Sequence, residues 1–257
     1  MTLIAATAAG VKPRGPVLEK IWLQHYPAGV PAEINPSEYR SLRELIEQAI
    51  AAHRDRPCFT CMDRTLTYGD VDVLAGRFAA YLQQVARLRK GDRIALMLPN
   101  VLQYPVAILG AFRAGLTIVN TNPMYTPREL QHQLHDSGAR AILILENFAH
   151  TLAEVQHDVH LDTVIVTGVG DLLAFPKSML VNFVLRHVKK QVPEYSLPGA
   201  VSLTEALSKG RYENLERVEL GHEDIAFLQY TGGTTGVSKG AVLTHRNLIA
   251  NVLQSEA

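Results

Sequence analysis

The sequence predicts an α/β fold in which a mostly parallel sheet is flanked by helices. Short apolar or β-branched runs alternate with segments whose apolar residues recur at helical spacing. Alternation of this kind favours parallel strands that are covered on both faces. The 257 residues, with a hydrophobic share of 47% and a charged share of 19%, are enough to bury a substantial core.

The first expected elements are a helix, a hairpin and a second helix. Ser41–Glu44 has the sequence of a capping box, and apolar residues follow it at helical spacing. Pro57–Met62 and Thr65–Thr67 predict a hairpin that turns at Asp63–Arg64. A longer helix is expected from about Gly69 to Arg87.

Four strands with helices between them are expected next. The strands cover residues 93–98, 116–120, 141–145 and 163–167. One helix covers 101–113 and closes at Gly115. Another begins at the capping sequence Thr126–Glu129, which has proline at its first helical position, and stops at Gly138.

The last part of the chain reads as strand, loop, strand and helix. Asp224–Tyr230 is a short apolar run typical of a buried strand, and Ala241–Thr244 predicts a second strand. Thr244 or Asn247 would cap the helix that follows. Residues 248–257 keep a helical pattern without a stop signal, so we expect a truncated chain.

The loop between these two strands is the most informative segment. Tyr230–Gly240 contains four glycines, three threonines and one lysine within eleven positions. Glycines let the backbone approach a ligand closely, while hydroxyls, backbone N–H groups and an ammonium group attract anionic oxygens. The mixture predicts a polyphosphate-binding loop; the alternative is an ordinary surface turn.

Two common nucleotide loops do not fit this segment. In the loop of kinase-type hydrolases, glycine precedes the lysine and Ser or Thr follows it, whereas here Ser238 precedes Lys239 and Gly240 follows it. A dinucleotide fingerprint also fails, because Gly232 is followed directly by Gly233.

The loop and the residues after it resemble the signature of adenylate-forming enzymes, the superfamily of acyl-CoA synthetases, luciferases and peptide-synthetase adenylation domains. The chain is most similar to bacterial long-chain fatty-acid–CoA ligases. Further segments resemble that subfamily in the same order: Ile21–Pro27, Glu33–Pro36, Leu66–Asp70, Leu98–Asn100, Phe112–Gly115 and Asn122–Leu130. The resemblance covers roughly residues 19–257 as a partial N-terminal AMP-binding domain, and residues 1–18 are expected to be a loose leader.

The resemblance implies the N-terminal part of the adenylate-forming fold and a two-step reaction. ATP would activate a long-chain fatty acid to an acyl-adenylate with release of pyrophosphate, and coenzyme A would then displace AMP. ATP, Mg²⁺ and coenzyme A are the implied cofactors. Lys239 is the expected catalytic residue and Thr231 the expected metal ligand. The implied nucleotide-binding residues are Tyr230, Thr231, Gly232, Gly233, Thr234, Thr235, Gly236, Val237, Ser238, Lys239, Gly240 and Ala241.

This sequence departs from the superfamily at two positions of the loop. Ser238 stands where proline is usual, and Gly232 stands where Ser or Thr is usual, although glycine also occurs in the long-chain subfamily. The adenine pocket, the acidic metal ligand and a mobile C-terminal domain are implied to lie downstream, so this chain alone is expected to be inactive. Two alternatives stay open, namely a related ligase for another carboxylic acid and a non-catalytic fragment that binds nucleotide or membrane.

Charge and hydropathy narrow the partners and the location. Lys plus Arg equals Asp plus Glu at 25 each, which argues against nucleic-acid binding. No segment reaches the roughly 20 apolar residues that span a bilayer. The apolar first ten residues have no basic region before them, so we expect a cytoplasmic protein without a signal peptide. The interpretation also allows a homodimer.

The segment Leu172–Gln191 has two interpretations. It contains an apolar stretch followed by basic residues, as in a helix that lies on the inner face of the cell membrane. The alternative is a buried crossover helix with a solvated basic end.

Cysteines and histidines outside the loop give weaker signals. Cys58 and Cys61 have redox-motif spacing, but a strand would direct residues three apart to opposite faces. The pairs His132/His135 and His157/His160 lack the third ligand of a zinc site, so solvated helix faces are expected. His245 follows the loop and is either a site candidate or a capping or packing residue.

Overall fold

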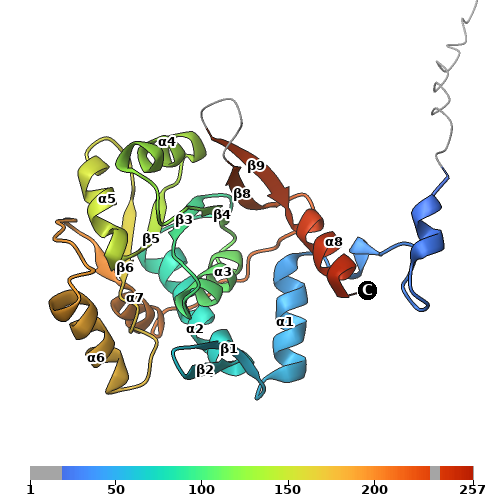
Figure 1. The fold of residues 1–257 in the computed structure, drawn as a ribbon, viewed down its shortest axis with the longest axis horizontal. Coiled ribbons are helices and arrows are strands. Elements are labelled where there is room, and N and C mark those ends of the chain that lie inside the picture. Colours follow the sequence, from blue (N-terminus) through green and yellow to red (C-terminus); the bar gives the residue numbers. More distant parts are fainter. Residues whose placement is uncertain (1–18, 232–237, 257) are drawn as a thin grey trace, which may run out of the picture.

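The computed structural model describes residues 19–231 and 238–256 (Figure 1). The leader expected at residues 1–18 therefore lies outside the described residues. Short 3₁₀ helices at Ile21–His25 and Pro36–Glu38 precede the main body of the fold.

A mostly parallel sheet forms the centre of the fold. Among the described residues it has seven strands in the order β7-β6-β5-β3-β4-β8-β9, and only β9 runs antiparallel to its neighbour. The strands are β3 (Arg93–Met97), β4 (Thr117–Asn120), β5 (Ala141–Leu145), β6 (Thr163–Thr167), β7 (Val201–Ser202), β8 (Ile225–Thr231) and β9 (Lys239–Thr244). The predicted fold class and strands are confirmed, with shifts of one or two residues at their ends.

Helices cover both faces of the sheet (Figure 1). On one face lie α2 (Tyr68–Ala80), α3 (Gln103–Arg113) and α7 (Leu203–Gly210), and on the other lie α4 (Pro127–Ser137) and α5 (Ala149–Val155). Within β3, Ile94 and Leu96 pack on the first group, while Ala95 and Met97 pack on the second. Both faces of β3 are buried, which explains why its sequence is a continuous apolar run.

A third apolar cluster joins the N-terminal elements to the sheet. It packs α1 (Leu42–His53) and the hairpin of β1 (Pro57–Cys61) and β2 (Arg64–Thr67) against α2 and α3. The hairpin turns at Met62 and Asp63, which both have positive φ, one residue earlier than predicted.

Local capping motifs set most of the helix starts. Complete capping boxes open α2 at Thr67 and α4 at Thr126. The box predicted at Ser41 forms only in half: its hydroxyl accepts from the Glu44 backbone N–H, while the Glu44 carboxylate accepts from the Arg40 N–H instead. Gly138 ends α4 in the left-handed conformation that glycine favours.

The two cysteines correct one expectation. Both thiols are free and both side chains pack against the same apolar cluster under α2 and α3. The strand rule predicted opposite faces, but the pairing of β1 with β2 is irregular between Pro57 and Phe59, and this shifts the alternation. Burial raises the pKa of the Cys58 thiol.

The structure of the segment after β6 contradicts a second expectation, that of a buried crossover helix. It forms α6 (Lys177–Phe183), continues as a π-helical turn η5 (Val184–Val188), and buries none of its residues completely. The interpretation as a buried crossover helix is therefore wrong. A similar π-turn, η3 (Tyr81–Val85), completes the helix predicted up to Arg87. Within residues 19–231 and 238–256, no helix is long and apolar enough to cross a membrane.

Candidate nucleotide-binding site

The candidate site lies at the open end of the β8–β9 hairpin. The ladder runs from Ile225 opposite Thr244 to a last rung in which Thr231 faces Lys239. The predicted loop closes the hairpin beyond this rung. Six of its expected contact residues, 232–237, lie outside the described residues. The others are Tyr230, Thr231, Ser238, Lys239, Gly240 and Ala241, which the hairpin brings together at its end.

Tyr230 fixes one side of the loop to the body of the protein. Its side chain is buried, and its hydroxyl donates a hydrogen bond of 2.5 Å to a carboxylate oxygen of Asp136 on α4. Burial and the adjacent Asp136 carboxylate raise the pKa of Tyr230, so this hydroxyl stays protonated. A Cβ at Gly240 would lie 2.9 Å from the Tyr230 ring, which explains the glycine at that position.

His132 fixes the other side of the loop. Its Nε2 lies 3.2 Å from the backbone oxygen of Ser238, to which the protonated nitrogen donates. His132 and Asp136 are four residues apart and so share one face of α4. The expectation of solvated histidines holds for His135, His157 and His160 but is wrong for the half-buried His132.

Sequence reasoning did not find the roles of His132 and Asp136. Their contact partners are roughly one hundred residues away in sequence, as the separations of 106 and 94 positions show. The only available signal was the four-residue spacing of two polar residues on one helix face.

The root of the loop, by which we mean the end of β8 and the start of β9, exposes two polar side chains, Thr231 and Lys239. Both residues are exposed, in contrast to Tyr230 beside them. The hairpin therefore presents an ammonium and a hydroxyl to solvent while its aromatic anchor faces the protein.

A cleft lies next to this root at the carboxyl ends of the parallel strands. The ends of β3, β4 and β8 border the cleft. Ligands of open α/β sheets bind in the crevice outside the carboxyl ends of the strands. The cleft there has a volume of about 250 Å³ and is lined by Leu96, Leu98, Tyr104, Asn120, Thr121, Asn122, Tyr125, Gln229 and Tyr230.

A chain of side-chain hydrogen bonds crosses the floor of this cleft. The Tyr104 hydroxyl donates to Asn120 Oδ1 over 2.7 Å, and Asn120 Nδ2 donates to Gln229 Oε1 over 2.8 Å. These bonds join α3, β4 and β8. The sequence analysis did not single out these three residues, because polar residues in three separate elements give no local pattern.

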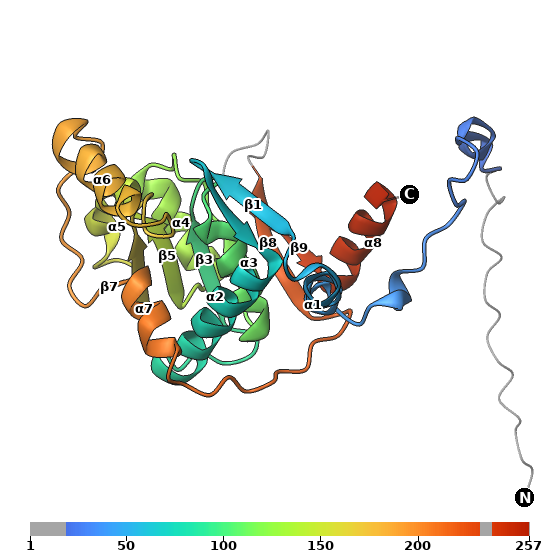
Figure 2. The same ribbon diagram turned by 90° about the horizontal axis from the view of Figure 1, so that it is seen from below.

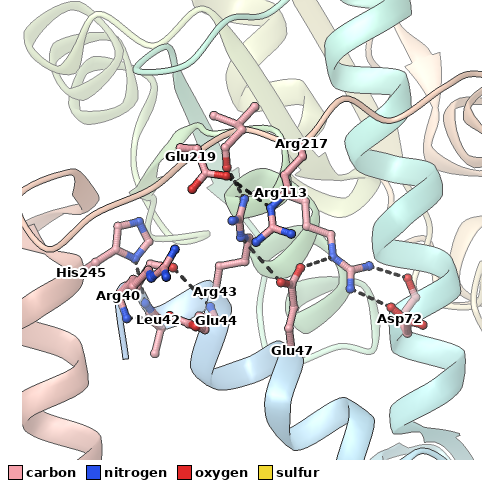
Figure 3. A network of polar contacts seen from close by, with 12 residues as sticks. Arg40, Leu42, Arg43, Glu44, Glu47, Asp72, Arg113, Arg217, Glu219 and His245 are labelled. Carbon is pink, nitrogen blue, oxygen red and sulfur yellow. Dashed lines mark hydrogen bonds and ion pairs between the residues drawn. The ribbon is translucent and has the colours of Figure 1, made fainter. Parts of the chain in front are cut away.

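His245 is a structural residue at the opposite end of β9 from the loop (Figure 3). It is fully buried, its Nδ1 accepts from the Leu42 backbone N–H over 3.2 Å, and its ring contacts Phe112. Burial lowers the pKa of His245 to about 4. The packing and capping interpretation is therefore confirmed: the neutral ring joins the start of α8 (His245–Glu256) to the start of α1.

A network of ion pairs holds the same region together (Figure 3). The Arg113 guanidinium on α3 bonds Asp72 on α2 over 2.7 Å and Glu47 on α1 over 3.1 Å. Arg43 donates to the Val218 backbone oxygen over 2.5 Å, which ties the segment before β8 to α1. The helices under the hairpin thus form one connected support.

Acidic metal ligands do not gather in the part of the chain that the structure describes. There, no three residues among His, Cys, Asp and Glu form a cluster that could hold an ion. The exposed Thr231 hydroxyl oxygen suits Mg²⁺, which often takes few protein ligands together with phosphate oxygens and water.

A mostly parallel sheet with a cleft at the carboxyl ends of its strands and a Gly/Thr-rich hairpin beside that cleft is the arrangement of a nucleotide-binding α/β protein. The chain belongs to the AMP-binding enzyme family, whose model matches residues 46–257. It is 53% identical over 240 residues to a long-chain-fatty-acid–CoA ligase of Salmonella typhi, covering 93% of this chain and 43% of that protein. It is 52% identical over 239 residues to the Haemophilus influenzae ligase of the same name, covering 93% and 42%.

Solved structures show the same fold. A long-chain-fatty-acid–CoA ligase from Archaeoglobus fulgidus superposes with a TM-score of 0.67 at 26% identity, covering 90% of this chain and 41% of the other. An anthranilate CoA ligase bound to anthranoyl-AMP gives a TM-score of 0.67 at 19% identity, covering 83% and 37%. The chain thus spans less than half the length of the curated relatives it matches.

Proposed function

We propose that this chain is the N-terminal part of an ATP-dependent long-chain fatty-acid–CoA ligase. The observation that carries the proposal is the identity of 52–53% over 93% of the chain to ligases of that name. In the proposed reaction, a fatty carboxylate attacks the α-phosphorus of ATP and forms an acyl-adenylate and pyrophosphate. The thiol of coenzyme A then displaces AMP and forms the thioester.

The proposed task of the hairpin is to hold the departing pyrophosphate. The first step brings a carboxylate toward a nucleotide that already carries several negative charges, so donors aimed at the leaving group lower the barrier. Lys239 would supply an ammonium group, Thr231 a hydroxyl, and residues 232–237 their backbone N–H groups and further hydroxyls. The exposure of Thr231 and Lys239 at the end of the hairpin supports these roles.

The contacts of α4 support a positioning role for the root of the loop. Asp136 holds the Tyr230 hydroxyl and His132 holds the Ser238 backbone oxygen, one on each strand. Anchoring the ends of both strands reduces the conformational entropy that is lost when phosphate binds. Mg²⁺, when bound, would neutralise phosphate charge beside the Thr231 hydroxyl.

The proposal also covers the extent of the domain, the location of the whole protein, its substrates and its oligomeric state. Residues 19–257 would form part of an AMP-binding domain preceded by a leader, and this part alone would lack ligase activity. The whole protein would work in the cytoplasm, with peripheral contact at the inner face of the cell membrane. A long-chain fatty acid and coenzyme A would be its substrates, and the homodimer stays a prediction.

Fatty-acid-dependent exchange of labelled pyrophosphate into ATP tests the proposal in the protein of natural length. We expect exchange with palmitate, and a loss of roughly 100-fold in Lys239→Ala, since one lost donor costs about 3 kcal/mol. Lys209→Ala is a matched control, because Lys209 is exposed on α7, where it pairs with Glu205. Near-normal exchange in Lys239→Ala, or no exchange with any long-chain acid in the unchanged protein, would refute the assignment.

A further inference from the structure

The solvent-exposed surface of α6 and η5 carries large apolar side chains instead of the usual polar ones. Five large apolar residues on or beside these helices are exposed, which we call the α6 face. Their exposed fractions are Phe175 79%, Met179 67%, Leu180 61%, Phe183 57% and Val188 65%. Met179 and Phe183 lie one helical turn apart, and the Phe183 ring contacts His187 a further turn along. A contiguous apolar stripe of this kind marks an interaction surface.

The opposite side of the same helices contacts the protein through polar side chains and half-buried apolar ones. Asn182 accepts from the Gly170 N–H over 2.7 Å and donates to Asp171 over 2.8 Å. Arg186 forms an ion pair with the buried Glu146 beyond β5. These bonds fix the rotation of α6 and η5 about their axis, so the apolar stripe is held facing outward.

The close approach of α6 to the turn after β6 supports this fixed orientation. A Cβ at Gly170 would lie 2.5 Å from the Ser178 backbone oxygen, so only glycine allows the contact. Lys177 at the start of α6 donates to the Met62 backbone oxygen over 2.6 Å and pairs with Asp63, both in the turn of the β1–β2 hairpin. Polar groups thus attach α6 and η5 to the protein along their length, and Val181 also packs against the apolar cluster under α2 and α3.

The charged side chains within the segment itself have one sign. Residues 172–193 contain four Lys or Arg residues and no Asp or Glu, although the whole chain has 25 of each charge. Lys189 and Lys190 directly follow Val188 and are exposed. The surface therefore pairs an apolar stripe with a basic end.

We propose that the α6 face docks the protein on an anionic lipid bilayer. Helices with an apolar outer face and a basic edge lie in the membrane interface, where each Lys or Arg adds attraction to anionic lipid. A second copy of the chain fits less well, because two Lys189–Lys190 ends would repel each other. The α6 face lies near the β7 edge of the sheet, at the opposite end of the fold from β9 and α8 (Figure 2). Docking through the α6 face therefore leaves the candidate nucleotide site uncovered.

This proposal gives the membrane contact of the proposed function a defined surface. Co-sedimentation with vesicles tests it without ATP, fatty acid or coenzyme A, so a negative result would leave the ligase assignment intact. The protein of natural length is mixed with vesicles of phosphatidylcholine alone or with added phosphatidylglycerol, at low and high salt. We expect binding to the anionic vesicles and its reduction by salt.

Two double variants separate the apolar and the charged contributions. Met179→Ser with Phe183→Ser should reduce partitioning at least tenfold, and Lys189→Gln with Lys190→Gln should reduce it by roughly thirtyfold, from about 1 kcal/mol per lysine. Val73→Ser with Tyr212→Ser, which changes exposed apolar residues elsewhere, should bind as the unchanged protein does. Anionic-vesicle binding that neither α6 variant weakens, or no binding by the unchanged protein, would overturn the proposal. A dimer that Met179→Ser with Phe183→Ser dissociates would also overturn it, by assigning the face to a second copy.

Discussion

Thr231 and Lys239 face each other in the last rung of the β8–β9 ladder, and both residues are exposed. Opposite residues of an antiparallel pair have Cβ atoms roughly 5 Å apart on the same face of the sheet. The hydroxyl and the ammonium group can therefore reach one anion together. Tyr230, which is buried one position before Thr231, holds this rung against α4 through Asp136.

Tyr230→Phe should weaken this attachment without changing the shape of the ring. The lost hydrogen bond ends on a carboxylate, so we expect the free energy of unfolding to fall by roughly 1.5 kcal/mol, as measured by urea denaturation. Tyr104→Phe is the matched control, because its hydroxyl bonds the neutral Asn120 and should contribute less. An equal or larger loss in the control would contradict the importance of the Asp136 contact.

Gly210→Ala should destabilise the packing of α7 on α2. A Cβ at Gly210 would lie 1.9 Å from the Arg77 backbone oxygen, so the two helices would have to separate. We expect a loss of roughly 1–3 kcal/mol in the free energy of unfolding.

Gly76→Ala on α2 provides the control for this change. Its nearest neighbour would be the Arg113 guanidinium at 3.6 Å, an ordinary van der Waals distance, and alanine favours a helix interior by up to about 1 kcal/mol. Chemical denaturation should therefore show opposite signs for the two variants. A stabilised Gly210→Ala variant would show that α7 does not pack as described.

His245 should make the protein less stable in mild acid. Its pKa is about 4 in the folded state against an ordinary value of 6.5, so between these values only the unfolded chain binds the proton. The free energy of unfolding should therefore fall as the pH drops from about 6.5 toward 4, by up to roughly 1.4 kcal/mol per pH unit, and this group should have no effect above about pH 7.5.

His245→Asn separates this contribution from those of the other titratable groups. Asparagine keeps an acceptor for the Leu42 N–H but does not titrate. The slope of the free energy of unfolding against pH should therefore be smaller by the contribution of about one proton, roughly 1.4 kcal/mol per pH unit. The comparison uses the slopes, because the loss of the Phe112 contact lowers the stability at every pH. Identical slopes in the two proteins would contradict a neutral buried His245.

Most strands and helix starts, though not the two-residue strand β7, were predictable because local physics sets them. Strands such as β5 are buried on both faces and read as continuous apolar runs, and the capping sequence at Thr126 works within four residues. Thr244 and Asn247, the two cap candidates for α8, bond each other's backbone N–H groups. The short helices α5 and α7 were not predicted, because seven or eight residues hold too little periodicity.

Contacts between distant residues were not predictable from the sequence. Helical spacing indicates which residues share a face but not which way that face points, so the sequence left both a buried and an exposed interpretation of α6 open. The alternation rule placed Cys58 and Cys61 on opposite faces because a bulge depends on the partner strand. In the site, the sequence identified the loop through its composition, whereas His132 and Asp136 act across about one hundred residues.

Product inhibition of the natural-length protein tests the central claim most directly, namely that the hairpin grips the pyrophosphate end of the nucleotide. In Lys239→Ala, the inhibition constant of pyrophosphate should rise roughly 100-fold, from the loss of about 3 kcal/mol, while that of AMP should stay within about twofold. An unchanged constant for pyrophosphate, or an equal rise for AMP, would contradict the account.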